Sequence, residues 1–235
     1  MRVAPLPLVT NTLIDALPRT ARNRLLSICE SVDLVSGRLV TGSDTPTRHV
    51  YFPTGSILSL MTSSKDSPVL EVGMVGSEGM LGLQVVLAAG SVPLQANVSG
   101  SGTAWRVGAE SFNRELAGSR SLRQSLNCYL QVTLLQLSTE ARCVRFHQID
   151  QRLARWLLMK QDRTHADSFS VTQALIAHLL GVRRVGIAKA AGAFQRRGII
   201  RYARGVLTIV DRKALESQSC ACYETARNIY ARFMP

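Results

Sequence analysis

The sequence predicts an α+β protein in which a β-rich N-terminal part, one long helix and a C-terminal helix-turn-helix follow one another. Three observations support this order: short apolar runs separated by glycine and proline over Val32–Val107, a stretch without either residue over Leu122–His147, and a helix–glycine–helix pattern over Thr172–Gln195. The chain has 235 residues, enough for two modest domains or for one domain with an appendage, and its composition, 46% hydrophobic and 19% charged, argues against disorder.

The N-terminal part begins with helical spacing over Thr12–Glu30, which Pro18 interrupts. Short β-type runs then alternate with turn residues, at Leu34–Val35, Val50–Phe52, Ile57–Met61, Val69–Met74 and Thr103–Val107. Many short strands at close intervals are typical of a small antiparallel barrel or sandwich.

The stretch Leu122–His147 predicts one long helix. Its apolar residues follow heptad spacing, which suits a dimer seam formed by Leu130, Leu134, Leu137, Ala141 and Val144. Packing of this face against its own domain is the alternative interpretation. A further helix is expected at Ile149–Gln161, with Leu153, Trp156 and Leu157 packed under the helix-turn-helix, and then a polar loop over Asp162–Ser168.

The helix-turn-helix begins at Thr172, a residue type that caps helices well. Gly181 supplies the positive φ that ends the first helix, and the second helix, 182–195, leaves Arg183, Arg184 and Lys189 outside. The runs Ile199–Tyr202 and Val206–Val210 predict a β-hairpin with Arg201 and Arg204 at or beside its turn. A helix-turn-helix followed by a basic hairpin is a winged helix-turn-helix, which places a helix in the DNA major groove. An ordinary helical hairpin is the alternative.

The charge distribution favours DNA as the partner. The formal net charge is +12, and residues 148–235 hold 15 Lys/Arg against 6 Asp/Glu, a net of +9, whereas residues 1–147 hold 13 against 10. A positive surface in the C-terminal third attracts a polyphosphate by counterion release.

This order of parts resembles the CRP/FNR family of bacterial transcription regulators. The resemblance spans roughly Leu13 to Glu216 and is strongest over Arg152–Leu158 and Thr172–Asp211, whereas Tyr51–Gly55 and Glu71–Gly82 match the family's cyclic-nucleotide-type β-roll more loosely. It implies a β-roll domain at 12–118, a dimerisation helix at 119–147, a winged helix-turn-helix at 148–216 and a helical tail at 217–235.

The resemblance also suggests roles on the second helix. The family often carries Arg-Glu-Thr-Val-x-Arg where this chain has Arg184–Lys189. Arg184 keeps the arginine expected to bond guanine, Val185 cannot accept a bond from cytosine but can contact a thymine methyl, and Lys189 keeps charge without the planar fork. Thr172, Gln173 and Arg183 suit phosphate contacts, which fix register. A homodimer should therefore read a palindrome that differs from the family's best-known site.

The sensor half departs from the cyclic-AMP-binding members of the family. Those members carry Gly-Glu-Leu and, about ten residues later, an arginine that binds the cyclic phosphate. In this chain Gly82 is followed by Leu83 and Gln84, and no Arg or Lys occurs between Gly76 and Gly102. We therefore expect an effector other than cyclic AMP. The corresponding pocket positions are Glu78, Gly82, Leu83, Leu94 and Gln95, although Glu78 also reads as a solvated turn residue.

Metals and cofactors are not predicted. Cys29, Cys128 and Cys143 read as buried thiols, and Cys220 and Cys222 form a single C-x-C, whereas zinc or iron–sulfur sites need about four ligands. The N-terminal cysteine cluster of the oxygen-sensing branch is missing. Redox sensitivity of the C-x-C pair, and a haem bound by His49 or His147, are left open.

Location and partners follow by default. The apolar N-terminal stretch Met1–Val9 is too short and too interrupted by proline for a signal peptide, and no transmembrane run occurs, so a cytoplasmic protein is expected. The expected partners are double-stranded DNA, a second copy of the chain and, as a further candidate, RNA polymerase. A sensor that acts through a protein partner is the alternative. An enzyme is not predicted, because nucleophile-elbow, P-loop and HExxH patterns are missing and Cys143 with His147 is thin evidence for a catalytic dyad.

Overall fold

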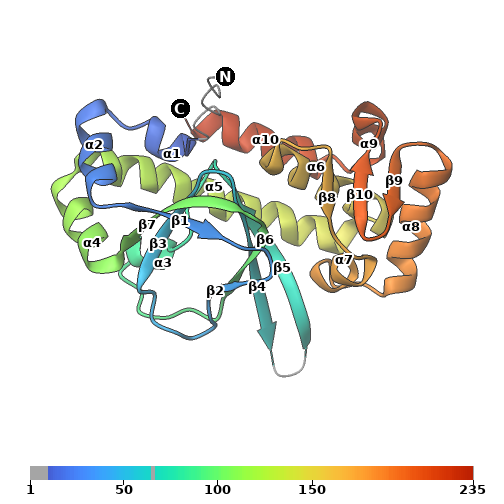
Figure 1. Cartoon of the computed structure of the whole chain (residues 1–235), viewed down its shortest axis with the longest axis horizontal. Coiled ribbons are helices and arrows are strands. Elements are labelled where there is room, and N and C mark those ends of the chain that lie inside the picture. The colour runs from blue at the N-terminus through green and yellow to red at the C-terminus, as the bar shows by residue number, and fades with distance from the viewer. Residues whose placement is uncertain (1–9, 65–66, 235) are drawn as a thin grey trace, which may run out of the picture. The chain divides into compact units, whose positions relative to one another are not determined.

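The computed structural model describes residues 10–64 and 67–234 (Figure 1). The stretch Met1–Val9, to which the signal-peptide prediction refers, lies outside the described residues. Two compact units make up the chain. The N-terminal unit comprises Met1–Ser59, Met74–Val92 and Ala96–Tyr129, and the C-terminal unit comprises Leu60–Gly73, Pro93–Gln95 and Leu130–Pro235.

The N-terminal unit confirms the predicted mixture of antiparallel strands and short helices. In chain order its elements are α1 (Thr12–Asp15), α2 (Arg19–Ser27), β1 (Glu30–Leu34), β2 (Leu39–Thr41), β3 (His49–Pro53), β4 (Ile57–Ser64), β5 (Ser67–Val75), α3 (Leu83–Val86), β6 (Gln95–Gly100), β7 (Gly102–Gly108) and α4 (Ala109–Gly118), with parts of β4, β5 and β6 in the C-terminal unit. One sheet has the order β1-β7-β3 and a second has the order β2-β6-β4-β5. The interruption at Pro18 separates α1 from α2, as expected.

The core of this unit lies between β3, β7 and α4. Phe52 on β3 and Phe112 on α4 are fully buried, and their ring centroids are 6.1 Å apart. Asn11 closes one end: its side-chain amide donates to the carbonyls of Pro53 (2.9 Å) and Gly79 (2.8 Å), and its side-chain oxygen caps α1. These bonds satisfy a buried amide that would otherwise cost about 1–3 kcal/mol.

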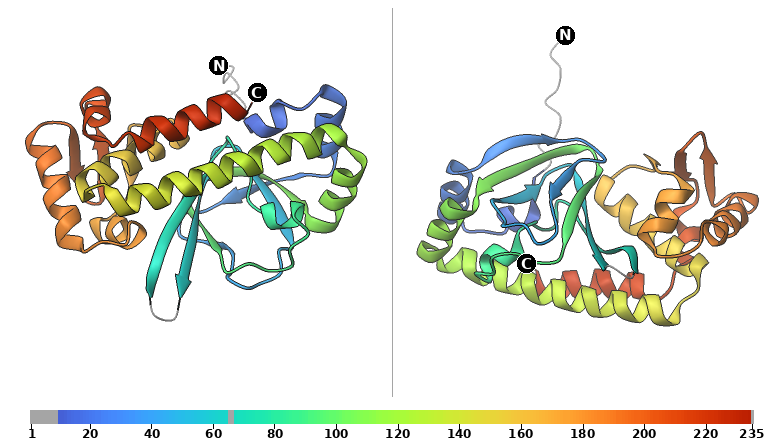
Figure 2. Two further views of the ribbon diagram at one scale, coloured as in Figure 1. Left: turned by 180° about the vertical axis from the view of Figure 1, so that it is seen from behind. Right: turned by 90° about the horizontal axis from the view of Figure 1, so that it is seen from below.

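The predicted long helix is α5 (Arg120–Phe146), which begins two residues earlier and ends one residue earlier than expected. The elements that follow are α6 (Ile149–Thr164), β8 (Ser168–Ser170), α7 (Gln173–Leu179), α8 (Arg184–Arg196), β9 (Ile200–Ala203), β10 (Val206–Ile209), α9 (Arg212–Gln218) and α10 (Cys222–Phe233). In both views of Figure 2, α10 runs alongside the C-terminal half of α5. Within the predicted helical tail, α10 is the only complete helix of the described residues, and the break at Ser219–Ala221 separates it from the last two residues of α9.

The C-terminal unit is built around α6, which contacts α8 and α9. Leu153 and Leu157 are completely buried, and Trp156 nearly so, in line with their predicted place under the helix-turn-helix. The three-stranded sheet has the order β8-β10-β9. Strand β8 was missed by the sequence analysis, which expected only a hairpin, because Phe169 is the only buried residue of its three. Among the helices that the structure describes, none is long and apolar enough to cross a membrane.

Candidate DNA-binding surface

The turn between α7 and α8 has the predicted construction. Thr172 caps α7, since its side chain accepts a bond from the backbone N–H of Leu175 (3.1 Å). Gly181 has φ +61°, in the left-handed region that favours glycine. From α6, the buried guanidinium of Arg152 donates to the carbonyl of Leu180 (2.6 Å), so the end of α7 is tied to the domain core. The turn is therefore held from both sides, which fixes where α8 begins.

Helix α8 has one buried face and one basic face. Its buried side chains are Ile187, Ala190, Ala191 and Phe194. Arg184, Val185 and Lys189 are exposed, and Val185 reaches 72% exposure, which is high for a large apolar side chain. Arg183 precedes the helix as its N-cap residue but makes no capping bond with its side chain. The first two turns thus present two guanidinium groups and an ammonium group to solvent, with no acidic residue in the first turn.

The hairpin of β9 and β10 carries a further pair of cations. Ala203 pairs with Val206, so Arg204 and Gly205 form a two-residue turn, and their φ angles are +51° and +79°. Positive φ at both central residues is the type I′ pattern, which matches the twist of the strands. Arg204 is an unusual residue for this position, because left-handed backbone costs a residue with a Cβ about 1–2 kcal/mol. Its side chain stands exposed at the tip, and that of Arg201 is exposed on β9.

The acidic residues of this unit do not neutralise these cations. Asp162 and Glu216 both pair with Arg212, at 2.7 and 2.9 Å, and Asp211 caps α9 through the N–H of Ala214. Among the described residues, none of the basic side chains of the hairpin, of α8 or of its N-cap takes part in an ion pair; these are Arg183, Arg184, Lys189, Arg196, Arg201 and Arg204. Their charges are therefore available to an anionic partner.

Buried polar contacts hold α6 in place beneath this surface. Arg155 pairs with Glu140 of α5; burial alone would lower the pKa of Arg155, but the charge and hydrogen bond of Glu140 raise it. Trp156 donates its indole N–H to Glu71 (2.8 Å). Lys160 lies over the Trp156 ring, and burial lowers its pKa to about 8, although the charge of Glu71 acts in the opposite direction. Burial therefore destabilises the protonated form of Lys160, and the dependence of stability on pH can test this.

Comparisons with known proteins agree with this geometry. The fold resembles the regulator FixK2 from Bradyrhizobium japonicum, with a TM-score of 0.67 and 14% identity, over 83% of this chain and 98% of that one. It also resembles a protein from Eubacterium rectale described as a transcriptional regulator of the Crp/Fnr family, with a TM-score of 0.66 and 17% identity, over 88% of this chain and 96% of that one. The c-di-GMP-responsive global regulator CLP of Xanthomonas campestris gives a TM-score of 0.66 and 15% identity, over 82% of this chain and 99% of that one.

Identities this low show a shared fold, and a sequence match to a family model identifies the C-terminal domain. Residues 151–218 match the Crp-like helix-turn-helix domain. The C-terminal segment therefore belongs to the Crp-like helix-turn-helix domains. A comparison with curated proteins finds no relative that matches the sequence. The domain match thus covers residues 151–218, and for the rest of the chain the comparisons show the fold alone.

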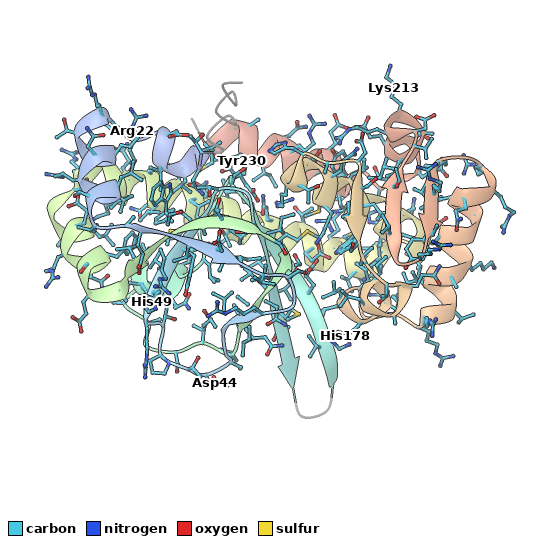
Figure 3. The ribbon with its side chains drawn as sticks, viewed as in Figure 1. Arg22, Asp44, His49, His178, Lys213 and Tyr230 are labelled. Atoms are coloured by element: carbon cyan, nitrogen blue, oxygen red, sulfur yellow. The ribbon has the colours of Figure 1, made fainter. Side chains whose placement is uncertain are left out.

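The Crp-like domain exposes residues on α8 that the sequence analysis did not select. Ala188 and Arg196 are exposed, and Gly192 is half-buried on the same side of the helix. At 100° per residue these positions follow Arg184 and Val185 along one face, so helical periodicity alone could have identified them. His178 is exposed near the end of α7 (Figure 3). The outward face of α8 is therefore longer than its first two turns.

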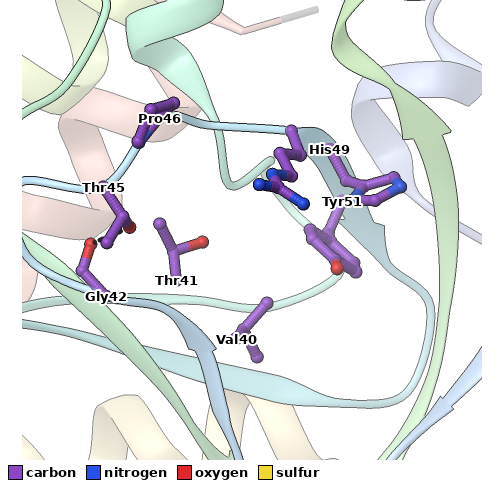
Figure 4. A pocket seen from close by; sticks show the side chains of 8 residues that line it. Val40, Thr41, Gly42, Thr45, Pro46, His49 and Tyr51 are labelled. Carbon is purple, nitrogen blue, oxygen red and sulfur yellow. Dashed lines mark hydrogen bonds between the residues drawn. The ribbon is translucent and has the colours of Figure 1, made fainter.

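The N-terminal unit contains a cavity of about 370 Å³ (Figure 4). It is lined by Val40, Thr41, Gly42, Thr45, Pro46, Arg48, His49 and Tyr51. In the figure, His49 and Tyr51 lie across the space from Thr41 and Thr45, and Thr45 donates to the carbonyl of Gly42 (2.7 Å). None of the pocket positions inferred from the resemblance lines this cavity; those positions are Glu78, Gly82, Leu83, Leu94 and Gln95. Their role as an effector site stays a prediction.

Proposed function

We propose that this chain is a homodimeric transcription regulator that reads a palindromic DNA site through α8. In this proposal Arg184 and Val185 face base edges in the major groove, with Lys189 one turn further along. Thr172, Gln173 and Arg183 contact phosphates beside them, and the hairpin brings Arg201 and Arg204 to the adjacent backbone. The observation that carries the proposal is the row of unpaired cations at the start of α8 in a Crp-like domain.

Base reading by α8 follows from the chemistry of its first turns. An arginine can donate two bonds to O6 and N7 of one guanine, which is worth about 1–3 kcal/mol of discrimination against other bases. Val185 is large, apolar and exposed, and a thymine methyl is a partner that would cover it. Arg183, without a capping role, is free to donate to a phosphate oxygen.

Dimerisation is supported by the heptad stripe on α5. Leu134 is 68% exposed, Leu137 and Val144 are also exposed, as is Ala141, and Leu130 is half-buried. Four of the five predicted seam residues therefore stay uncovered by the single chain. A second α5 packed on the same stripe would bury them, because heptad spacing matches the knobs and holes of a parallel or antiparallel helix pair. Two copies would then present two copies of α8 to the two half-sites of a palindrome.

The effector of the proposed regulator is not cyclic AMP bound in the family's usual way. Leu83 and Gln84 occupy the positions where such members carry the residues that hold the ribose, and Leu94 and Gln95 lie where a phosphate-binding arginine is expected. Gln84 instead donates its side-chain amide to Thr47. A buried phosphate without a cation would be strongly destabilised.

Selection from a random pool of duplex DNA tests the proposal. Purified protein is incubated with the pool at near-physiological salt and without effector, and bound sequences are read after several rounds. The expected result is a palindromic motif that Arg184→Ala blurs at one position of each half-site. Lys213→Ala is the matched control, since it removes one charge from the same unit on α9, on the side away from His178 and α7 (Figure 3). A pool that stays random for protein shown to be folded and dimeric would count against effector-independent DNA reading and favour a protein partner.

A further inference from the structure

Four metal-ligating side chains meet in the C-terminal unit, outside the DNA-binding surface. They are Cys143, His147, Cys220 and Cys222, and their ligand atoms all lie within 4.8 Å of one another. The Sγ atoms of Cys143 and Cys220 are 3.5 Å apart, and Sγ of Cys222 is 3.6 Å from Nδ1 of His147. All three cysteines are buried and His147 is partly exposed. The sequence analysis predicted no metal site, because the C-x-C pair appeared to lack two ligands.

Each half of this cluster has a local cause. Cys143 and His147 are four residues apart at the end of α5, and helical spacing places such residues on one face. The backbone N–H of His147 donates to the carbonyl of Cys143 (3.1 Å), so the helical geometry extends to the histidine. Cys220 lies in the break between α9 and α10, and Cys222 is the first residue of α10. The break turns both sulfurs toward the end of α5.

The spacing suits one metal ion. Zinc binds sulfur at about 2.3 Å and nitrogen at about 2.0–2.1 Å, so the corners of its tetrahedron are about 3.8 Å apart for two sulfurs and about 3.6 Å for sulfur and nitrogen. The Cys143–Cys220 and Cys222–His147 pairs already have separations of this size, and a pair at the 4.8 Å limit would contract by about 1 Å. A four-iron cluster holds its ligands on four different metal atoms and therefore separates them more widely. A set of three thiolates and one imidazole is a donor set typical of structural zinc.

We propose that Cys143, His147, Cys220 and Cys222 bind one Zn²⁺ per chain as a closed structural site. Binding forms three zinc–sulfur bonds and one zinc–nitrogen bond, and each thiol that is protonated beforehand releases its proton to solvent. No electron is transferred. With four protein ligands no position is left open for water, so the site is structural and has no catalytic role.

A neighbouring arginine fits this assignment. Zinc with three thiolates carries a net charge of −1, and the positive charge of Arg155 acts on all three sulfur groups. The Nη1 atom of Arg155 pairs with Glu140, whereas its Nε atom is buried without a hydrogen-bond partner in the described part of the chain. Metal-bound thiolates accept hydrogen bonds, and such contacts around a site tune its metal affinity. A charge and a spare donor thus lie beside the proposed ion.

The site would give the C-terminal tail a function. Zinc would tie the α9–α10 break to the last turn of α5, three residues before α6 begins. The ion would therefore fix the junction that leads into the Crp-like domain and hold α10 in place. Because zinc binding is coupled to folding, its removal should loosen α10 before the rest of the unit.

The test is metal analysis of the full chain, purified under reducing conditions without chelator. Zinc is measured by mass spectrometry, and metal-free protein is then titrated with Co²⁺, whose visible spectrum reports tetrahedral thiolate coordination. The variants are Cys220→Ser and His147→Asn, and Cys128→Ser is the matched control, a thiol on α5 outside the cluster. His147→Asn changes a partly exposed side chain, so it preserves folding even where the buried thiol substitution does not.

We expect about one zinc per chain and a tetrahedral cobalt spectrum for the wild type and for Cys128→Ser. The two ligand variants should lose more than about 100-fold in metal affinity, because loss of a residue that only hydrogen-bonds to a metal ligand already lowers affinity about 10–100-fold. Folded, reduced wild-type protein that binds neither Zn²⁺ nor Co²⁺ would overturn the proposal. So would bound iron with inorganic sulfide, or a Cys143–Cys220 disulfide in a parallel preparation without reductant, because these identify the cluster as an iron–sulfur site or a redox pair.

Discussion

Arg204 offers a substitution in which stability and DNA affinity should move in opposite directions. Its φ of +51° lies in the left-handed region, where asparagine is tolerated better than other residues with a Cβ. Arg204→Asn should therefore stabilise the hairpin by about 0.5–1 kcal/mol, because part of the cost of about 1–2 kcal/mol is relieved. For a protein of this size, that corresponds to a rise in Tm of about 1–4 °C.

The same substitution should weaken DNA binding. A phosphate contact contributes a slope of about −0.9 to the dependence of log affinity on log salt, and the proposed dimer loses two contacts, so the slope should fall in magnitude by about 1.8. At about 0.15 M salt this corresponds to an affinity loss of about 30-fold. Fluorescence anisotropy with a labelled duplex, over a range of salt concentrations, measures both quantities, and calorimetry measures Tm.

Two control variants separate charge from backbone. Arg204→Lys keeps the cation in the same backbone conformation, so its Tm and its salt slope should both stay close to those of the wild type. Lys213→Ala removes a charge elsewhere in the unit and should leave the slope nearly unchanged. A stabilised Arg204→Asn protein with the wild-type slope and affinity would refute the placement of the hairpin tip against phosphate.

Three further predictions concern the dimer, the turn and the buried lysine. Leu134→Asp should weaken dimerisation at least about 100-fold in sedimentation experiments, because about 3 kcal/mol of apolar burial is lost over two copies. The control is Gln131→Asp, which changes an exposed residue outside the heptad stripe and should leave the protein dimeric. An unchanged dimer for Leu134→Asp would exclude this seam. Gly181→Ala should lower the free energy of unfolding, measured by denaturant titration, more than Gly198→Ala does. Both glycines have positive φ, but only at Gly181 does the added Cβ come close to another side chain, 2.9 Å from Leu70. Equal losses would show that this contact has no effect on stability. Lys160 is 3% exposed, and burial lowers its pKa from 10.5 to about 8. Between about pH 8 and pH 10.5 the unfolded chain therefore binds more protons than the folded chain. The free energy of unfolding should rise by up to about 3 kcal/mol as the pH increases through this window. The stability difference between wild type and Lys160→Met should follow this curve, and a flat difference from pH 7.5 to 10.5 would contradict the shift.

Local signals in the sequence predicted much of the helix-turn-helix. The cap at Thr172 and the positive φ at Gly181 depend on residues only a few positions apart, and both predictions are confirmed. The long helix α5 was also predicted from local sequence, because it contains no glycine or proline that would break a helix. The break that separates α9 from α10 was not predicted, because Ser219–Ala221 contains neither glycine nor proline.

Contacts between distant residues account for what the sequence did not predict. Cys143 and Cys220 are 77 positions apart. The spacing of cysteines along the sequence therefore indicated only an isolated C-x-C pair, whereas the fold brings four candidate ligands together. The bond from Arg152 to the carbonyl of Leu180 joins α6 to the turn across 28 positions. Such partners become visible only when the packing of α5, α6 and the two C-terminal helices is known.

The most direct test of the proposed DNA recognition is a set of binding titrations with every single-base variant of the selected operator. Wild type, Arg183→Ala and Arg184→Ala are compared at one salt concentration; Arg183 makes no capping bond and alanine suits the first turn of α8, so both variants should fold normally. Arg184→Ala should erase about 1–3 kcal/mol of preference at one base pair of each half-site, whereas Arg183→Ala should weaken all duplexes by the same factor. Equal behaviour of the two variants across the panel would contradict the division of α8 into a base-reading residue and a phosphate-binding residue.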